Sequence, residues 1–166
     1  MKGDATFVAP ATPFGHSGVA VIRINGPLSK NILSELSRTR IAKPKSVTLT
    51  KLYDSKENLL DECLVTYFVS PSSYTGDDMV EISCHGNPVI VDKIIKTINN
   101  HGARPAEAGE FTKRAFINGK LDLLQAEAVG ALIKSKSEVA AKINQQTLNG
   151  ALSAALIKIR ASLISL

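Results

Sequence analysis

Short apolar stretches, separated by Gly, Pro and Asn turns, recur along the first 120 residues. Stretches of this length that are rich in β-branched residues are typical of strands. They predict strands at residues 6–9, 19–24, 47–52, 63–69 and 79–83. The third and fourth of these could pair as a hairpin, and the composition of residues 71–78 predicts a loop.

Apolar residues at helical spacing predict helices between these strands. The first covers residues 28–37, and its apolar face holds Leu28, Ile32, Leu33 and Leu36. A second helix opens at Asn87 and Pro88, because Asn is suited to the cap and Pro to the first helical position. It stops at residues 101–102, and residues 107–118 contain a third helix.

The chain changes character after Leu121. Proline vanishes, and Ala, Leu, Ile and Lys dominate, which is typical of helices. One apolar stripe holds Leu121, Leu124, Ala128, Ala131 and Leu132; another holds Leu148, Leu152, Leu156, Ile159, Leu163 and Leu166. The second stripe has bundle or coiled-coil spacing and is still running at residue 166, so we expect a second copy or further sequence to cover it. The pattern predicts an α/β-mixed domain followed by an all-helical segment.

Composition places the chain among globular proteins. Its 166 residues are 44% apolar and 21% charged, and no apolar run is long enough to span a membrane. Two cysteines make no disulfide framework, so we expect a reduced, cytoplasmic protein. The net charge of +5 favours an anionic partner, although a lysine-rich surface accounts for it equally well.

Several motifs of nucleotide, metal and nucleophile chemistry are absent from the sequence. A P-loop ends in Gly-Lys followed by Ser or Thr, whereas Gly119-Lys120 is followed by Leu121. A metal site needs clustered ligands, and Cys84-His85 is the only adjacent pair among the His and Cys residues. We expect no metal site, a turn at His85 and a buried, structural Cys84.

Three charged residues stand in unusual places. Arg23 and Glu81 each lie inside an otherwise apolar strand, and Lys120 lies between a glycine and an apolar helix. A carboxylate can accept parallel N–H bonds from a guanidine-like heterocycle, and a cation can hold carboxylates. The competing interpretation is simple alternation, in which Arg23 and Glu81 face solvent on half-buried strands.

These stretches resemble the N-terminal part of the MnmE/TrmE family of tRNA modification GTPases. The resemblance covers essentially the whole chain, in order and spacing. It is carried by residues 9–13, 18–26, 73–86, 103–116, 118–123 and 125–128. The sequence departs from the family at residues 14–17, where Phe-Gly-His-Ser replaces the common Pro-Gly-Arg/Lys-Gly.

The resemblance implies an α+β fold. It consists of a tetrahydrofolate-binding, aminomethyltransferase-like domain over residues 1–120, which also dimerises, and the first helices of an all-α domain over residues 121–166. The ligand is a tetrahydrofolate derivative, 5-formyl- or 5,10-methylene-tetrahydrofolate, and its contacts are Arg23, Glu81 and Lys120. Glu81 would accept N–H bonds from the pterin, and the two cations would meet its carbonyl or the folate carboxylates.

The resemblance also implies the setting of the whole enzyme. With an FAD-containing partner it modifies C5 of the wobble uridine of tRNA, using GTP with Mg²⁺ and K⁺, and it is a homodimer with no membrane partner. This sequence has no P-loop, so we expect no GTP hydrolysis from it and assign it no catalytic residue. The alternatives are a stand-alone folate-binding or regulatory module and a dimerisation scaffold without catalysis.

Overall fold

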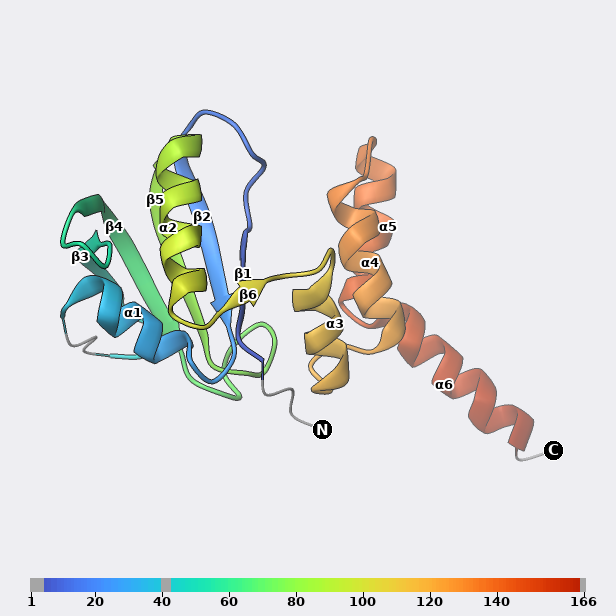
Figure 1. Ribbon diagram of the computed structural model, residues 1–166. Helices are drawn as coiled ribbons and strands as arrows, with labels where there is room; N and C mark the ends of the chain where they lie inside the picture. Colours follow the sequence, from blue (N-terminus) through green and yellow to red (C-terminus); the bar gives the residue numbers. More distant parts are fainter. Residues whose placement is uncertain (1–4, 40–42, 165–166) are drawn as a thin grey trace. The chain divides into compact units, whose positions relative to one another are not determined.

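The computed structural model describes residues 5–39 and 43–164. The chain divides into two compact units, Met1–Phe111 and Thr112–Leu166. The first is a mixed α/β domain and the second is helical, as the change in sequence pattern predicts (Figure 1). Among the described residues, no helix has both the length and the apolar character needed to cross a membrane.

Six strands of the first unit form one sheet in the order β3-β4-β5-β2-β1-β6. Their bounds are β1 Phe7–Pro10, β2 Ser17–Asn25, β3 Val47–Tyr53, β4 Leu59–Phe68, β5 Met79–Gly86 and β6 Arg104–Pro105. Neighbouring strands are antiparallel except for the β1–β6 pair. The predicted hairpin of β3 and β4 is confirmed, although β4 begins at Leu59 rather than at Cys63. The short strand β6 was not predicted.

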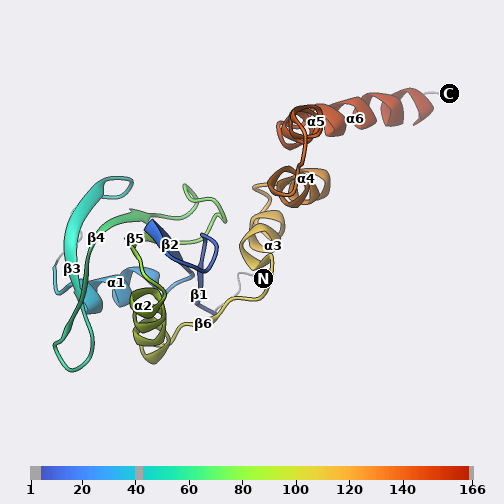
Figure 2. The ribbon, with the colours of Figure 1, turned by 90° about the horizontal axis from the view of Figure 1, so that it is seen from above.

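Two helices, α1 Ser29–Ser37 and α2 Pro88–Asn100, cover one face of this sheet (Figure 2). Alternate residues of the central strands point towards them and are buried. On the sheet side the core holds Ala20, Ile22, Ile24, Cys63, Val65, Val80, Ile82 and Cys84; on the helix side it holds Ile32, Leu33, Leu36, Val91, Ile94 and Ile98. No helix of this unit covers the opposite, open face of the sheet among the described residues (Figure 2).

Two local features set the connections between sheet and helices. The Asn87 side chain accepts the backbone N–H of Val89 at 2.9 Å, so the predicted cap of α2 is confirmed. At the turn from β2 into α1, Gly26 has a φ of 120°, and a Cβ there would lie 2.8 Å from the Cα of Thr6. Only glycine suits that combination of backbone conformation and close approach.

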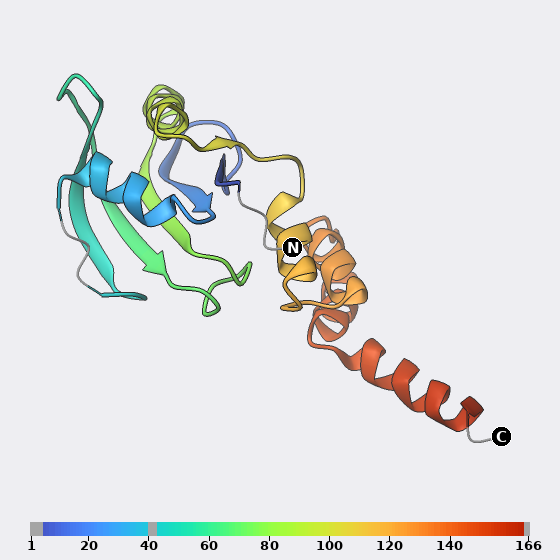
Figure 3. The ribbon, with the colours of Figure 1, turned by 60° about the horizontal axis from the view of Figure 1, so that its bottom comes forward.

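The helical unit contains α3 Glu110–Ile117, which begins two residues before the unit itself, then α4 Leu123–Ile133, α5 Glu138–Leu148 and α6 Ala151–Ile164. Figure 3 shows α4 and α5 side by side, with α6 extending away from them. The prediction of one continuous stripe from residue 148 to 166 was wrong. Leu148 ends α5, Gly150 breaks the helix with a φ of 87°, and Leu166 lies outside the described residues.

Candidate functional site

Arg23 and Glu81 form an ion pair on the open face of the sheet. They are register partners on β2 and β5, and Arg23 Nε lies 2.7 Å from Glu81 Oε1. Their side chains are 33% and 27% exposed. Alternation predicts their direction correctly, because their neighbours Ile22, Ile24 and Ile82 point to the core. It does not predict that the two charges contact each other.

Tyr74 adds an aromatic ring to this pair, and sequence reasoning missed its role. The guanidinium carbon of Arg23 lies 5.7 Å from the centre of the Tyr74 ring, within the range of a cation–π contact. Tyr74 stands in the predicted loop between β4 and β5. The pair is therefore bounded by a loop as well as by two strands.

Hydrogen bonds fix the loop that carries Tyr74. Asp78 accepts the backbone N–H of Ser70 at 2.8 Å and the hydroxyl of Tyr67 at 2.9 Å. Burial is the main cause, and this bond to Asp78 the second, of a pKa of Tyr67 that is raised to about 12. Ser73 Oγ donates to the carbonyl of Asp77 at 2.5 Å and accepts the N–H of Gly76 at 2.9 Å. These bonds hold the loop in one conformation beside β2.

Asn25 ties the same loop to the end of β2. It is fully buried, its Oδ1 accepts the hydroxyl of Thr75, and its Nδ2 donates to Asp77 Oδ2 at 3.1 Å. The resemblance segment 73–86 thus contains a loop whose polar side chains bond to one another and to β2. The positions of Arg23 and Tyr74 follow from that network.

Aliphatic side chains lie beside the charged pair on the open face. One cross-strand row on this face runs from Leu49 through Leu64 and Ser83 to Val21. The next row on the same face, two residues along each strand, holds Arg23 and Glu81. Leu49 and Leu64 are 63% and 46% exposed. A cavity of about 300 Å³ opens here, lined by Gly18, Val19, Leu49, Glu62, Leu64, Ser83, Cys84 and His85.

His85 and Asp61 form a second pair at the rim of this cavity. The β4–β5 ladder ends at Leu64 and Ser83, and beyond it the buried Asp61 carboxylate accepts the backbone N–H of His85 at 2.8 Å. It also contacts His85 Nδ1 at 2.7 Å. His85 lies at the end of β5, not in the predicted turn.

The ionised state of Asp61 fixes the tautomer of the His85 imidazole. Burial opposes its ionisation, but the bonds from His85 and from the N–H of Glu62 outweigh burial and lower the pKa of Asp61 below its ordinary 3.8. An ionised carboxylate can only accept, so His85 Nδ1 donates, and Nε2 is the acceptor of the neutral ring. No sequence signal marked this pair, because the two residues are 24 positions apart and meet only where the ladder ends.

Lys120, the third predicted contact, lies in the helical unit. It follows Gly119, whose φ of 69° ends α3, and its backbone N–H donates to the carbonyl of Ala115 at 2.8 Å. Its side chain is exposed. The structure thus brings Arg23 and Glu81 into contact and places Lys120 immediately after α3.

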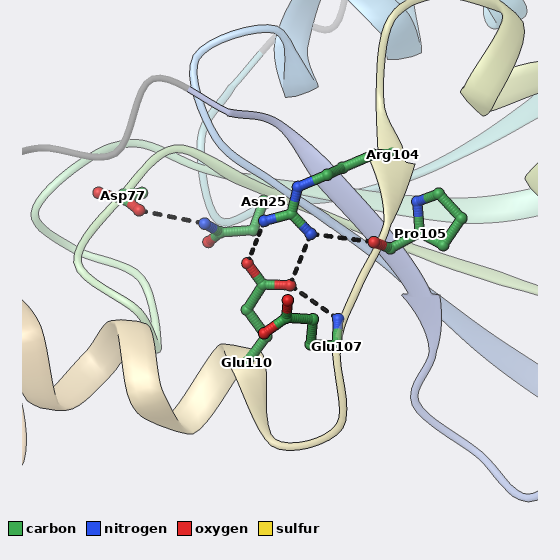
Figure 4. Close-up of polar contacts among 6 residues, drawn as sticks. All are labelled: Asn25, Asp77, Arg104, Pro105, Glu107 and Glu110. Atoms are coloured by element: carbon green, nitrogen blue, oxygen red, sulfur yellow. Dashed lines mark hydrogen bonds and ion pairs between the residues drawn. The ribbon is translucent and has the colours of Figure 1, made fainter.

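The segment 103–116, the longest of the resemblance, contains a further charged cluster (Figure 4). Both Nη groups of Arg104 donate to the Glu110 carboxylate, and Nη1 also donates to the carbonyl of Pro105 at 3.0 Å. Glu110 accepts the N–H of Glu107 at 2.8 Å, and hydrogen bonding to Glu110 raises the pKa of Arg104. Arg104 also lies 5.4 Å from the ring centre of Phe7. These contacts fasten the start of α3 to the sheet edge, which is a structural role.

The cysteines are buried, as expected for Cys84. Burial is the main cause, and the nearby Asp61 carboxylate the second, of the raised pKa of both thiols. The pKa of Cys84 is raised to about 11, and both thiols stay neutral at pH 7. Within the described part of the chain, no group of three or more His, Cys, Asp or Glu side chains is placed to hold a metal ion.

Comparisons with known proteins cover nearly the whole chain. The family described as GTP-binding protein TrmE N-terminus matches residues 6–120. A curated tRNA modification GTPase MnmE from Aquifex aeolicus (strain VF5) is 46% identical over 160 residues, which are 96% of this chain and 36% of that protein. The protein of the same name from Mesoplasma florum is 42% identical over 98% of this chain and 36% of its own length. This chain spans about a third of the length of these relatives.

Proposed function

Because this chain belongs to the family of the GTP-binding protein TrmE N-terminus, we propose that it is the folate-binding, dimer-forming part of a tRNA modification GTPase. The ligand is a reduced folate, 5-formyl- or 5,10-methylene-tetrahydrofolate. The observation that carries this proposal is the half-buried Arg23–Glu81 pair on the open face of the sheet.

The pair retains hydrogen-bonding capacity suited to a pterin. Their mutual contact uses Arg23 Nε and Glu81 Oε1; the Arg23 Nη groups and Glu81 Oε2 make no other hydrogen bond to a described residue. Oε2 can accept N–H groups of a guanidine-like ring, and the Nη groups can donate to a carbonyl or carboxylate. A folate presents all of these groups, so the residues present fit it.

Lys120 completes the proposed contact set, and Tyr74 offers a ring face next to Arg23. Arg23 and Lys120 then meet the pterin carbonyl and the folate carboxylates, in either order. The folate supplies a one-carbon unit when bound. The role of this chain is to orient the pterin through Glu81 and to neutralise the anionic end of the ligand.

The proposed fold is the tetrahydrofolate-binding fold over residues 1–120, with residues 121–166 as the first part of a helical domain. A sheet with helices on one face and an open second face supports it, because the open face leaves room for a ligand. GTP, Mg²⁺, K⁺ and the FAD-containing partner belong to the complete enzyme, which acts on C5 of the wobble uridine of tRNA in the cytoplasm.

Self-pairing is proposed through the same open face. Val19, Val47, Leu49 and Leu64 leave aliphatic surface there, and burying it is favourable at about 25 cal/mol per Å². Leu64 on β4 alternates with core residues, so it points away from the helices. A second copy of the chain is the proposed cover.

Calorimetric titration with 5-formyltetrahydrofolate tests the ligand. The unsubstituted chain is expected to bind at one site per chain, and Glu81→Gln to weaken binding at least about tenfold by loss of a charged hydrogen bond. Glu35→Gln is the matched control, because Glu35 is an exposed carboxylate on α1, on the other side of the sheet. Equal losses in the two variants, or no binding by the folded chain, would refute the folate assignment.

Light scattering after gel filtration tests the dimer. Leu64→Lys places a charge on the open face and is expected to give monomers at concentrations where the unsubstituted chain is dimeric. Leu59→Lys is the control, since Leu59 lies on the same strand, is 55% exposed and lines the groove beside α2 instead. Dissociation by the control alone would place the interface on the helix side.

A further inference from the structure

The charges of the chain are divided unequally between its two units. The segment 1–111 has twelve Lys and Arg residues and twelve Asp and Glu residues, whereas 112–166 has eight and three. The first unit is therefore neutral, and the whole net charge of +5 lies in the helical unit.

The two units also differ in how their charged side chains are paired. The ion pairs of the first unit include Arg23–Glu81, Arg104–Glu110 and Lys96–Asp92. In the helical unit, two of the three acidic residues serve helix N-termini. Asp122 caps α4, where the Ser153 hydroxyl and the Gln125 N–H hold its pKa below the ordinary value, and Glu138 lies in the first turn of α5. Carboxylates there interact with the positive helix ends.

Three of the eight Lys and Arg residues of the helical unit lie near the turn that joins α4 to α5. Lys134 caps the end of α4, Lys136 lies in the turn between the helices, and Lys142 lies in the second turn of α5. All three are exposed, and none forms an ion pair with any described residue. The turn itself is ordered, because Asn144 Nδ2 donates to Ser135 Oγ at 3.0 Å.

We propose that this lysine cluster, defined as Lys134, Lys136 and Lys142, contacts the phosphate backbone of RNA. Unpaired lysines in and next to a short, ordered turn are point charges suited to phosphates, and they carry no base specificity. The neutral first unit adds no comparable attraction. The inference rests on the proposed function only in choosing RNA as the polyanion, because the relatives are named tRNA modification GTPases.

Fluorescence anisotropy of a short labelled RNA stem-loop tests the cluster with the whole chain. The triple variant Lys134→Gln, Lys136→Gln, Lys142→Gln is expected to bind at least about tenfold more weakly at about 50 mM salt. Its plot of log affinity against log salt should also become shallower by about 2, as expected for three lost phosphate contacts. Circular dichroism checks that the helices are retained.

The matched control removes three lysines of the neutral unit. Lys56→Gln, Lys93→Gln, Lys96→Gln makes the same charge change in the groove between the β3–β4 turn and α2. It is expected to bind RNA within about twofold of the unsubstituted chain. Equal loss in the two triple variants, greater loss in the control, or binding to anionic vesicles but not to RNA would overturn the proposal.

Folate titration of the same proteins separates the two proposals. Both triple variants are expected to keep folate binding, because the proposed folate contacts are intact. If the chain binds RNA through the cluster but not folate, the proposed function fails and the cluster stands. If it binds folate but the cluster variant binds RNA normally, only the cluster fails.

Discussion

The two units of the chain differ in what they bury. In the first unit, six strands and two helices enclose a core whose largest side chains, such as Ile22, Leu33 and Ile94, are fully buried. In the helical unit, Ala115 and Ala128 are the only buried residues among those described. The first unit therefore has the packing to hold side chains at fixed positions, as Arg23 and Glu81 require.

The two units also differ in what surrounds their exposed aliphatic side chains. In α6, Leu152, Leu156, Ile159 and Leu163 are all exposed, so the expectation that this stripe needs a cover remains a prediction. On the open face of the sheet, the exposed aliphatic residues lie beside a charged pair and line a cavity. Apolar exposure alone does not mark a site; convergent polar groups held by a packed scaffold do.

The largest expected effect on stability comes from an Ile→Ala substitution, which can be made in each of the two units and compared. Ile82→Ala empties a fully buried position and should lower the free energy of unfolding by about 2–5 kcal/mol. Ile159→Ala, at a position 57% exposed, should change it by less than about 0.5 kcal/mol. Urea titration followed by tyrosine fluorescence and by circular dichroism measures both. Tyr53, Tyr67 and Tyr74 all lie in the first unit, so the fluorescence reports that unit. A large loss from Ile159→Ala would show that α6 is covered in solution.

A smaller effect is expected at the buried carboxylate of the first unit. Asp61→Asn leaves an amide where three N–H donors converge and should cost about 1–3 kcal/mol at pH 7. Since the folded-state pKa of Asp61 is lowered, its contribution is complete above the ordinary value of 3.8 and is lost as pH falls through the lower folded pKa.

The acid limb of the stability curve should therefore be flatter in this variant than in the unsubstituted chain. Asp92→Asn is the control, because Asp92 belongs to an exposed pair with Lys96 on α2. Urea unfolding between about pH 2.5 and 7 measures both variants. An unchanged acid limb in Asp61→Asn would mean that this carboxylate does not set the acid stability of the fold.

The smallest expected effect concerns the helix caps, one in each unit. Asn87→Ala removes the cap of α2 and should lower the stability of the first unit by about 1 kcal/mol, and Asn87→Ser should restore most of it. Ser137→Ala removes the cap of α5, whose oxygen accepts the N–H of Ala140 at 3.2 Å, and should reduce helical circular dichroism. Caps of equal effect in tyrosine-detected unfolding would contradict the difference between the units.

Local sequence signals predicted much of the first unit. The Asn87-Pro88 start of α2, the β3–β4 hairpin and the direction of Arg23 and Glu81 follow from cap chemistry and alternation, which act over a few residues. The charges were recognised as unusual because each interrupts an apolar strand. Their mutual contact depends on the register of β2 against β5, which joins residues 58 apart and leaves no local trace.

The errors have physical causes too. The apolar spacing continues through the turn at Asn149 and Gly150, so periodicity alone placed Leu148, the last residue of α5, on the stripe of α6. The strand β6 has only two residues, one of them Pro105, and pairs in parallel with β1 because of tertiary contacts. The Asp61–His85 pair arises where β4 leaves β5, which no spacing rule describes.

Amide shift mapping tests most directly the central claim, which is that the open face of the sheet in the first unit holds the folate. Titration of ¹⁵N-labelled chain with 5-formyltetrahydrofolate should shift the amides of Arg23, Tyr74, Glu81 and Lys120, and should leave those of Lys93 and Lys96 on the other side of the sheet unchanged. Shifts confined to the helix side of the sheet, or no shifts from a folded chain, would contradict the account.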